Sequence, residues 1–212
     1  MLINKEAFSL IAHTILKAKK SGVFTKIVVS TDSKKIKNIS KKFGAESWFI
    51  RPKHLSSDKS GKHPAIRHLL ISAEKYFKIK FDVIVDLDPT APLRTINDIK
   101  FSLKKFKANK SDVLFSVCES KKNPYFNMVE IINNKIRLVK RKPNQILRRQ
   151  DAPKVYDLGC ISILKRGALL KRERMGLFTK KTSIYSMPPE RSLDIDTNYD
   201  WNLVKFLINN PL

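Results

Sequence analysis

Two pairs of aspartates in this sequence have the residue type and the spacing to take part in chemistry, and the first pair is Asp86 and Asp88. They interrupt an apolar run rich in β-branched residues, 83–87, at its carboxyl end. Pro89 and Pro92 then fix the backbone, so the chain must leave this run as a defined turn. Ligands of open α/β sheets bind outside the carboxyl ends of strands. The turn could therefore hold a metal or another polar ligand, or it could be a solvated loop whose aspartates only begin a turn.

The second pair is Asp194 and Asp196, in the run Leu193-Asp194-Ile195-Asp196. In an extended segment this alternation places both carboxylates on one face and both apolar side chains on the other. Two such carboxylates can hold Mg²⁺, which completes its coordination with water and substrate phosphate oxygens. The alternative is that Asp196 or Thr197 only caps the final helix.

Other catalytic patterns are missing from the sequence. It contains no phosphate loop, no GxGxxG run and no nucleophile elbow, and its four histidines form no pair at metal-ligand spacing. Four arginines lie in loops, where a forked guanidinium can bind a carboxylate or a phosphate: Arg51, Arg94, Arg149 and Arg191. Together these features favour metal-assisted transfer at phosphorus, which needs positioning and charge neutralisation more than a covalent nucleophile.

Helices and strands alternate along most of the sequence. The apolar spacing predicts a first helix that carries Phe8 and ends at Gly22, and a helix that ends near Gly44 and begins at a cap on Asp32 or Ser33. Later helices are expected around 65–73, around 97–106 and at 201–208, and strands at 26–32, 48–50, 83–87, 113–117, 160–164 and 182–187. Such alternation predicts a Rossmann-like α/β layer.

The stretch 128–139 departs from this alternation. Two β-rich runs flank Asn133-Asn134, which is a hairpin signal. The hairpin could be a dimerisation arm or an edge ornament. We expect one domain over residues 1–212, with 123–155 as the inserted hairpin element.

Composition restricts the class of protein. The 212 residues carry 43 basic and 19 acidic side chains, a formal charge of +24, and a basic nucleic-acid-binding protein is therefore the non-enzyme alternative. However, the lysines are spread along the chain, so we expect no specific nucleic acid as a partner. Cys118 and Cys160 form no CxxC pattern, and no apolar run approaches the ~20 residues that span a bilayer. These features predict a soluble, cytoplasmic protein with no membrane partner.

Five segments in order resemble the motifs of the acylneuraminate (CMP-sialic acid) cytidylyltransferases. The resemblance covers essentially the whole chain. The segments are Val28-Val29-Ser30-Thr31-Asp32; Arg51-Pro52 with Leu55 and Asp58; Pro89-Thr90-Ala91-Pro92-Leu93-Arg94; Arg149-Gln150-Asp151 with Pro153 and Tyr156; and Ser192-Leu193-Asp194-Ile195-Asp196-Thr197.

This resemblance implies a three-layer sandwich of the nucleotide-diphospho-sugar transferase type, with the hairpin as a homodimerisation element. It implies transfer of CMP from CTP to a nine-carbon 2-keto sugar acid, with Mg²⁺ as cofactor. The implied metal ligands are Asp194 and Asp196, which with Arg149 form the catalytic set. The implied substrate-binding residues are Arg51 on the nucleotide side, and Asp88, Thr90, Phe126, Gln150 and Tyr156 on the sugar side.

The sequence departs from the family at three places. Asp88 replaces the usual glutamine and Phe126 a usual lysine, so pseudaminic or legionaminic acid is as good a candidate substrate as N-acetylneuraminic acid. The family also has a central strand and a basic loop ahead of the residues that Met1-Leu2-Ile3-Asn4-Lys5 resemble. We therefore expect a true start upstream of Met1, or a degenerate, inactive copy.

Two other enzyme classes remain open. One is activation of the eight-carbon acid KDO. The other is a different nucleotide-sugar transferase, such as a glycosyltransferase in which Asp86-Leu87-Asp88 binds the metal.

Overall fold

The computed structural model describes residues 10–57, 59–144, 146–171 and 178–210. Its helices are α1 (Leu10–Ser21), α2 (Lys34–Lys42), α3 (Lys62–Phe77), α4 (Ile96–Ala108), α5 (Arg166–Lys171) and α6 (Asn198–Asn209). Its strands are β1 (Val83–Leu87), β2 (Val113–Glu119), β3 (Val129–Ile132), β4 (Lys135–Leu138), β5 (Tyr156–Lys165) and β6 (Thr182–Ser186). Short 3-10 helices cover Lys53–Leu55, Arg149–Asp151 and Pro189–Arg191.

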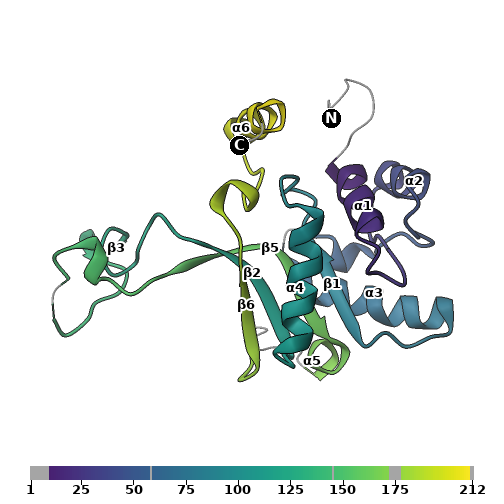
Figure 1. Ribbon diagram of the computed structural model, residues 1–212, viewed down its shortest axis with the longest axis horizontal. Helices are drawn as coiled ribbons and strands as arrows, with labels where there is room; N and C mark the ends of the chain where they lie inside the picture. Colours follow the sequence, from purple (N-terminus) through teal and green to yellow (C-terminus); the bar gives the residue numbers. More distant parts are fainter. Residues whose placement is uncertain (1–9, 58, 145, 172–177, 211–212) are drawn as a thin grey trace.

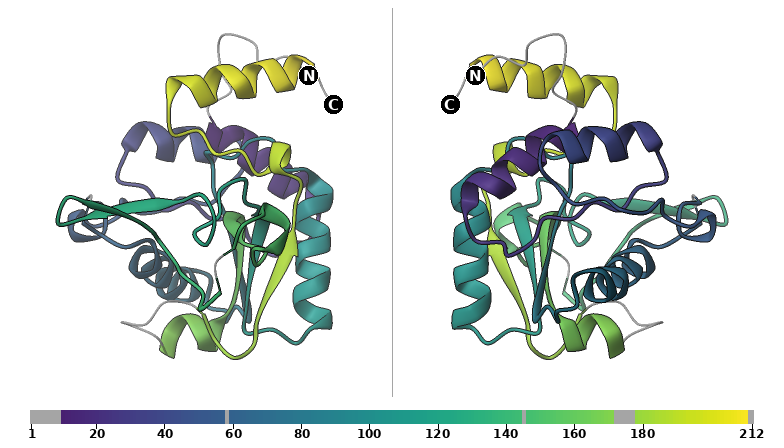
Figure 2. Two further views of the ribbon diagram at one scale, coloured as in Figure 1. Left: turned by 90° about the vertical axis from the view of Figure 1, so that its left-hand side faces the viewer. Right: turned by 90° about the vertical axis from the view of Figure 1, so that its right-hand side faces the viewer.

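The body of the molecule is a sheet between two layers of helices. The strand order is β1-β5-β2-β6, with β5 antiparallel to both neighbours and β6 parallel to β2. Helices α1 and α4 lie on one face, and α3 and α5 lie on the other (Figures 1 and 2). The predicted layered α/β fold is therefore confirmed.

The core lies at the two middle strands. Leu114 of β2 and Ile161 and Ile163 of β5 are completely buried, and they pack with Ile99 and Phe106 of α4. Burial on both faces explains why these strands read as continuous apolar runs rather than alternating ones.

The strands predicted at 26–32 and 48–50 are wrong as regular strands. Segment 26–32 makes one isolated parallel bridge, between Val28 and Glu46, and Glu46 lies ahead of the predicted strand 48–50. Val29 N donates to the Glu46 carbonyl at 2.9 Å, and Glu46 N donates to the Ile27 carbonyl at 2.8 Å. A strand requires a continuous ladder as well as an apolar composition. In the described ranges, segment 26–32 has this one bridge and a separate bond from Arg51 N to the Thr31 carbonyl, which do not make a ladder.

The predicted hairpin is confirmed as a separate two-stranded sheet, β3-β4. Asn133 and Asn134 have φ values of 50° and 59°, as a type I′ turn requires at both central positions. The long strands β2 and β5 lead out of the body towards this sheet, which projects from it (Figure 1). We name residues 121–155, which include the hairpin, the arm.

Most of the predicted helices are confirmed. Ser33 caps α2 through a bond from Ile36 N, and Thr95 caps α4 in a capping box with Asp98. The first helix is described from Leu10, so Phe8, like the motif residue Asp58 and the segment 1–5, lies outside the described residues.

Candidate functional site

The turn after β1 is anchored to the neighbouring strand. Asp88 N donates to the Cys160 carbonyl of β5 at 3.0 Å, and Ala91 N donates back to the Asp88 carbonyl at 3.4 Å. This turn follows the end of β1, where the sequence predicted a possible ligand site.

A lysine occupies the space between the two aspartates of this strand end. The Lys62 ammonium lies 2.6 Å from Asp86 Oδ2 and also contacts Asp88 Oδ1. Burial lowers the pKa of Lys62, but the two carboxylates outweigh it and raise that pKa above its ordinary value. Asp86 and Asp88 therefore hold an internal cation, which weakens the case for a metal between them.

The second pair of aspartates has the opposite environment. Asp194 and Asp196 are exposed while Leu193 and Ile195 are half-buried, as the alternation predicted. Within the described part of the chain, neither carboxylate forms an ion pair with a lysine or an arginine. The helix cap is Thr197, whose hydroxyl accepts from Asp200 N, so Asp196 is not needed for capping.

A backbone hydrogen bond joins the two acidic segments. Ile195 N donates to the Thr90 carbonyl at 3.0 Å, which places Asp194 and Asp196 beside the turn that carries Asp88. The structure thus brings together four of the predicted site residues from segments more than 100 residues apart in sequence.

Arg191 holds this second segment in place from its amino-terminal side. Its Nε and Nη2 donate to the buried Asp98 carboxylate at 3.0 and 3.1 Å. Asp98 also accepts from Thr95 and from the Tyr185 hydroxyl. Burial alone would raise the pKa of Asp98, but the hydrogen bonds from Thr95 and Arg191 outweigh it and lower the pKa.

Arg94 has a structural role instead of the ligand-binding role that its loop position indicated. Its side chain is completely buried and donates to the Cys160 carbonyl at 3.1 Å and to the Thr14 hydroxyl at 3.0 Å. Lys17 of α1 donates to the carbonyls of Pro92 and Arg94 at 2.6 and 2.5 Å. These contacts fasten the strand-end turn to α1.

Arg51 lies at the end of the extended segment 27–31. Its amide donates to the Thr31 carbonyl at 2.9 Å, and its guanidinium lies 3.7 Å from Asp32. Its Nε also donates to the Ser56 hydroxyl at 3.1 Å. This side chain is half-buried and held by Asp32 and Ser56.

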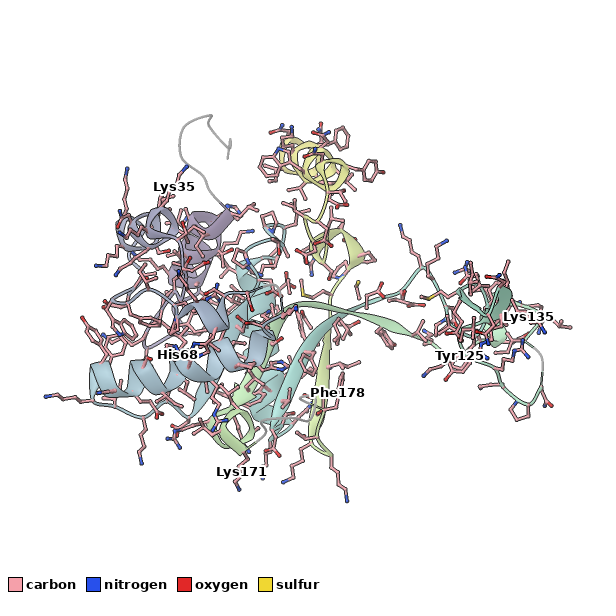
Figure 3. All side chains as sticks on the ribbon, turned by 180° about the vertical axis from the view of Figure 1, so that it is seen from behind. Lys35, His68, Tyr125, Lys135, Lys171 and Phe178 are labelled. Atoms are coloured by element: carbon pink, nitrogen blue, oxygen red, sulfur yellow. The ribbon has the colours of Figure 1, made fainter. Side chains whose placement is uncertain are left out.

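The remaining predicted residues lie on the arm or, in the case of Tyr156, directly after it. Arg149 stacks over the Phe126 ring at 5.8 Å and donates to the Lys121 carbonyl, and Gln150 follows it in a short 3-10 helix. Tyr156 begins β5, four residues before the Cys160 that touches Asp88, which is about 13 Å along the strand. Figure 3 shows the arm, marked by Tyr125, standing clear of the body. Within one chain, Phe126, Arg149 and Gln150 on the arm are therefore separate from the group formed by Asp88, Thr90, Asp194 and Asp196.

Sequence reasoning missed Lys62 and Asp98. The Lys62–Asp88 and Asp98–Arg191 contacts join residues 26 and 93 positions apart, so no local pattern marks these contacts, whereas Thr95 and Asp98 have the spacing of a capping box. Within the described ranges, no group of three or more His, Cys, Asp or Glu side chains is arranged to hold a metal. None of the described helices is both long and apolar enough to cross a membrane.

A family model described as "Cytidylyltransferase" matches residues 7–200. The chain belongs to this cytidylyltransferase family. Its members are nucleotidyltransferase enzymes, so the enzyme class expected from the motifs is confirmed.

Named relatives match nearly the whole chain. CMP-N,N'-diacetyllegionaminic acid synthase of Campylobacter jejuni is 41% identical over 208 residues, which cover 98% of this chain and 86% of the relative. Pseudaminic acid cytidylyltransferase of the same species is 31% identical and covers 93% and 84%. A solved CMP:2-keto-3-deoxy-manno-octonic acid synthetase complexed with CTP has a TM-score of 0.67 at 13% identity, covering 100% of this chain and 94% of that one. At this identity the likeness shows the shared fold alone.

Proposed function

We propose that this cytidylyltransferase transfers CMP from CTP to a nonulosonic acid, giving a CMP-sugar and pyrophosphate. The sequence relatives that support this are named for legionaminic and pseudaminic acids. The likeness to the enzyme of the eight-carbon acid is one of fold, so we prefer a nine-carbon acid to KDO.

The observation that carries the proposal is the Ile195–Thr90 hydrogen bond, which sets two open aspartates beside the sugar-side turn. Asp194 and Asp196 are solvent-facing and have no lysine or arginine partner in the described ranges, so the pair fits a cation such as Mg²⁺. Bound there, Mg²⁺ would neutralise charge on the triphosphate of CTP.

In the proposed reaction the anomeric hydroxyl oxygen of the sugar acid bonds to the α-phosphorus of CTP. The bond from that phosphorus to the bridging oxygen breaks, pyrophosphate leaves, and the hydroxyl proton passes to solvent. Arg51 binds on the nucleotide side, whereas Asp88 and Thr90 orient the sugar acid. The protein's task is to align the two substrates in line.

We also propose a homodimer in which the arm of each subunit completes the site of the other. The arm supplies Phe126, Arg149 and Gln150, and Tyr156 follows it at the start of β5. Its hairpin exposes large aliphatic side chains, with Ile131 at 70% and Ile136 at 71% of their full exposure. A two-stranded sheet is marginal by itself, and such an apolar surface marks an interaction site. The two separate groups of site residues are then brought together across the dimer.

A cytoplasmic location belongs to the same proposal. The structure has Cys118 and Cys160 as free thiols, which suits a reducing compartment, and the proposed substrate CTP is a cytoplasmic nucleotide.

The test is pyrophosphate release from CTP and MgCl₂ with a panel of acids: N,N'-diacetyllegionaminic, pseudaminic, N-acetylneuraminic and KDO. We expect release with a nine-carbon acid, and no release without metal or with KDO. Release with KDO alone, or with none of the acids, would overturn the proposal. Tight RNA binding that weakens steeply with salt, without stabilisation by CTP, would favour the nucleic-acid alternative.

A further inference from the structure

Lys62 occupies a position that the helix itself disfavours. It is the first residue of α3, and its N-cap Gly61 offers no side-chain cap. The amino terminus of a helix carries partial positive charge, and the first turn of α3 contains no acidic residue to offset a lysine. A lysine here with no other role would extend into solvent. Instead its ammonium turns to β1 and contacts two carboxylates.

The two carboxylates belong to residues 86 and 88, which lie on the same face of the strand because side chains alternate. Lys62 therefore fills the position of a cation between them and leaves one carboxylate charge uncompensated. Both aspartates are largely withdrawn from water, with side chains 22% and 29% exposed.

Asp88 depends on this lysine for its charge and its orientation. Burial raises the pKa of Asp88 above its ordinary value, and the adjacent Lys62 ammonium opposes that rise without cancelling it, so the lysine favours the ionised form. Lys62 holds Oδ1, whereas Oδ2 has no hydrogen bond to the described residues. An ionised carboxylate only accepts hydrogen bonds, unlike an amide, which both accepts and donates.

We propose, resting on the function proposed above, that Lys62 is a positioning residue that determines which sugar acid is accepted. It holds one oxygen of Asp88 and aims the other at an N–H or O–H donor of the sugar, so sugar acids with an acylamino N–H or a hydroxyl at that point are selected. A sugar acid that presents an acceptor there is rejected, because two acceptors would face each other without a proton between them.

The experiment compares Lys62→Met with Lys62→Arg and with Lys75→Met, an exposed lysine on the same helix. Lys62→Met should raise KM for the sugar acid about tenfold to a hundredfold, as expected for a lost hydrogen bond to a charged group, and leave KM for CTP within about twofold. Lys62→Arg should restore part of the loss. A lysine that only fastens α3 to β1 would lower the unfolding midpoint without separating the two KM values.

A double-mutant cycle shows whether Lys62 acts through Asp88. In an Asp88→Gln background the neutral amide needs no counter-ion, so adding Lys62→Met should not raise KM for the sugar acid further. An equal further rise in this background would overturn the proposal, and so would equal changes in both KM values for Lys62→Met alone.

The outcome for wild type separates this inference from the proposed function. If wild type releases no pyrophosphate with any acid, the proposed function fails, and calorimetric binding of the sugar acids then decides the role of Lys62. Binding that Lys62→Met weakens and Lys75→Met does not would support the role, whereas no binding by wild type would overturn it.

Discussion

The amide of Ile195 donates a hydrogen bond to the carbonyl of Thr90 at 3.0 Å, and this contact joins the two acidic segments of the molecule. The bond uses backbone groups only, so it fixes the path of residues 193–196 whatever their side chains are. With Ile195 facing inward, Asp194 and Asp196 face outward beside the strand-end turn. The two pairs of aspartates therefore differ in role: Asp86 and Asp88 bind a lysine, whereas the other pair is open to a metal.

Asp194→Asn and Asp196→Asn should each lower pyrophosphate release by about a hundredfold or more, because a neutral amide binds Mg²⁺ far more weakly than a carboxylate. Both side chains are exposed, so the free energy of unfolding should change by less than about 0.5 kcal/mol. Glu190→Gln, an exposed acid on the neighbouring 3-10 helix, is the matched control. Near-wild-type rates in both aspartate variants would exclude this pair as the metal site.

The sequence predicted local features well and distant contacts poorly. The bounds of β1 and the turn at Asn133-Asn134 follow from patterns a few residues long. The burial of Arg94 was missed because its partners, Thr14 and Cys160, are 80 and 66 residues away. The ion pairs of Lys62 were missed for the same reason, because its carboxylate partners belong to the next element along the chain. Segment 26–32 has strand composition, but pairing also depends on neighbours that composition does not specify.

Complementation between two inactive variants tests the shared site. Asp194→Asn lies on the body and Arg149→Ala on the arm, so each mixed dimer would have one intact site and one doubly altered site. Equal mixing after subunit exchange should recover about a quarter of the wild-type rate, because half of the dimers are mixed and half of their sites are intact. No recovery, with each single variant inactive and dimers exchanging, would place both groups in one subunit's own site.

The aliphatic face of the hairpin should hold the dimer together. Ile131 and Ile136 lie directly opposite each other in the β3-β4 pair. Ile136→Lys would put a charge into the interface, and we expect sedimentation velocity to show a shift towards monomer together with loss of pyrophosphate release. Lys135→Ala, one residue away and exposed, should sediment as wild type. A wild type that is monomeric at all concentrations would contradict the proposal.

Asp98→Asn should destabilise the protein in a way that depends on pH. At pH 7 it replaces a charged acceptor of Arg191, and we expect a loss of about 2 kcal/mol of unfolding free energy. The folded pKa of Asp98 is lowered, so its ionised form contributes stability that is present above the unfolded pKa of about 3.9 and is lost as pH falls through the folded value. In urea unfolding, the difference in free energy of unfolding between wild type and Asp98→Asn should therefore shrink below about pH 4. The exposed Asp157→Asn should show no such difference.

Lys17 gives a prediction at alkaline pH, where its charged form is the one that destabilises the folded protein. Burial, with the nearby Arg94 charge, lowers the pKa of Lys17 from 10.5 to about 8 in the folded state. Between about pH 8 and pH 10.5 the unfolded chain binds the extra proton, so stability from this group rises with pH across that window. Relative to Lys17→Met, wild type should gain on the order of 1 kcal/mol from pH 8 to pH 10.5 in urea unfolding. Lys20 is exposed on the same helix, so Lys20→Met controls for the general loss of positive charge. The difference in free energy of unfolding between Lys20→Met and wild type should stay constant over this pH range. A wild-type free energy of unfolding that stays constant or falls relative to that of Lys17→Met as pH rises would show that the ammonium is well accommodated between the carbonyls of Pro92 and Arg94.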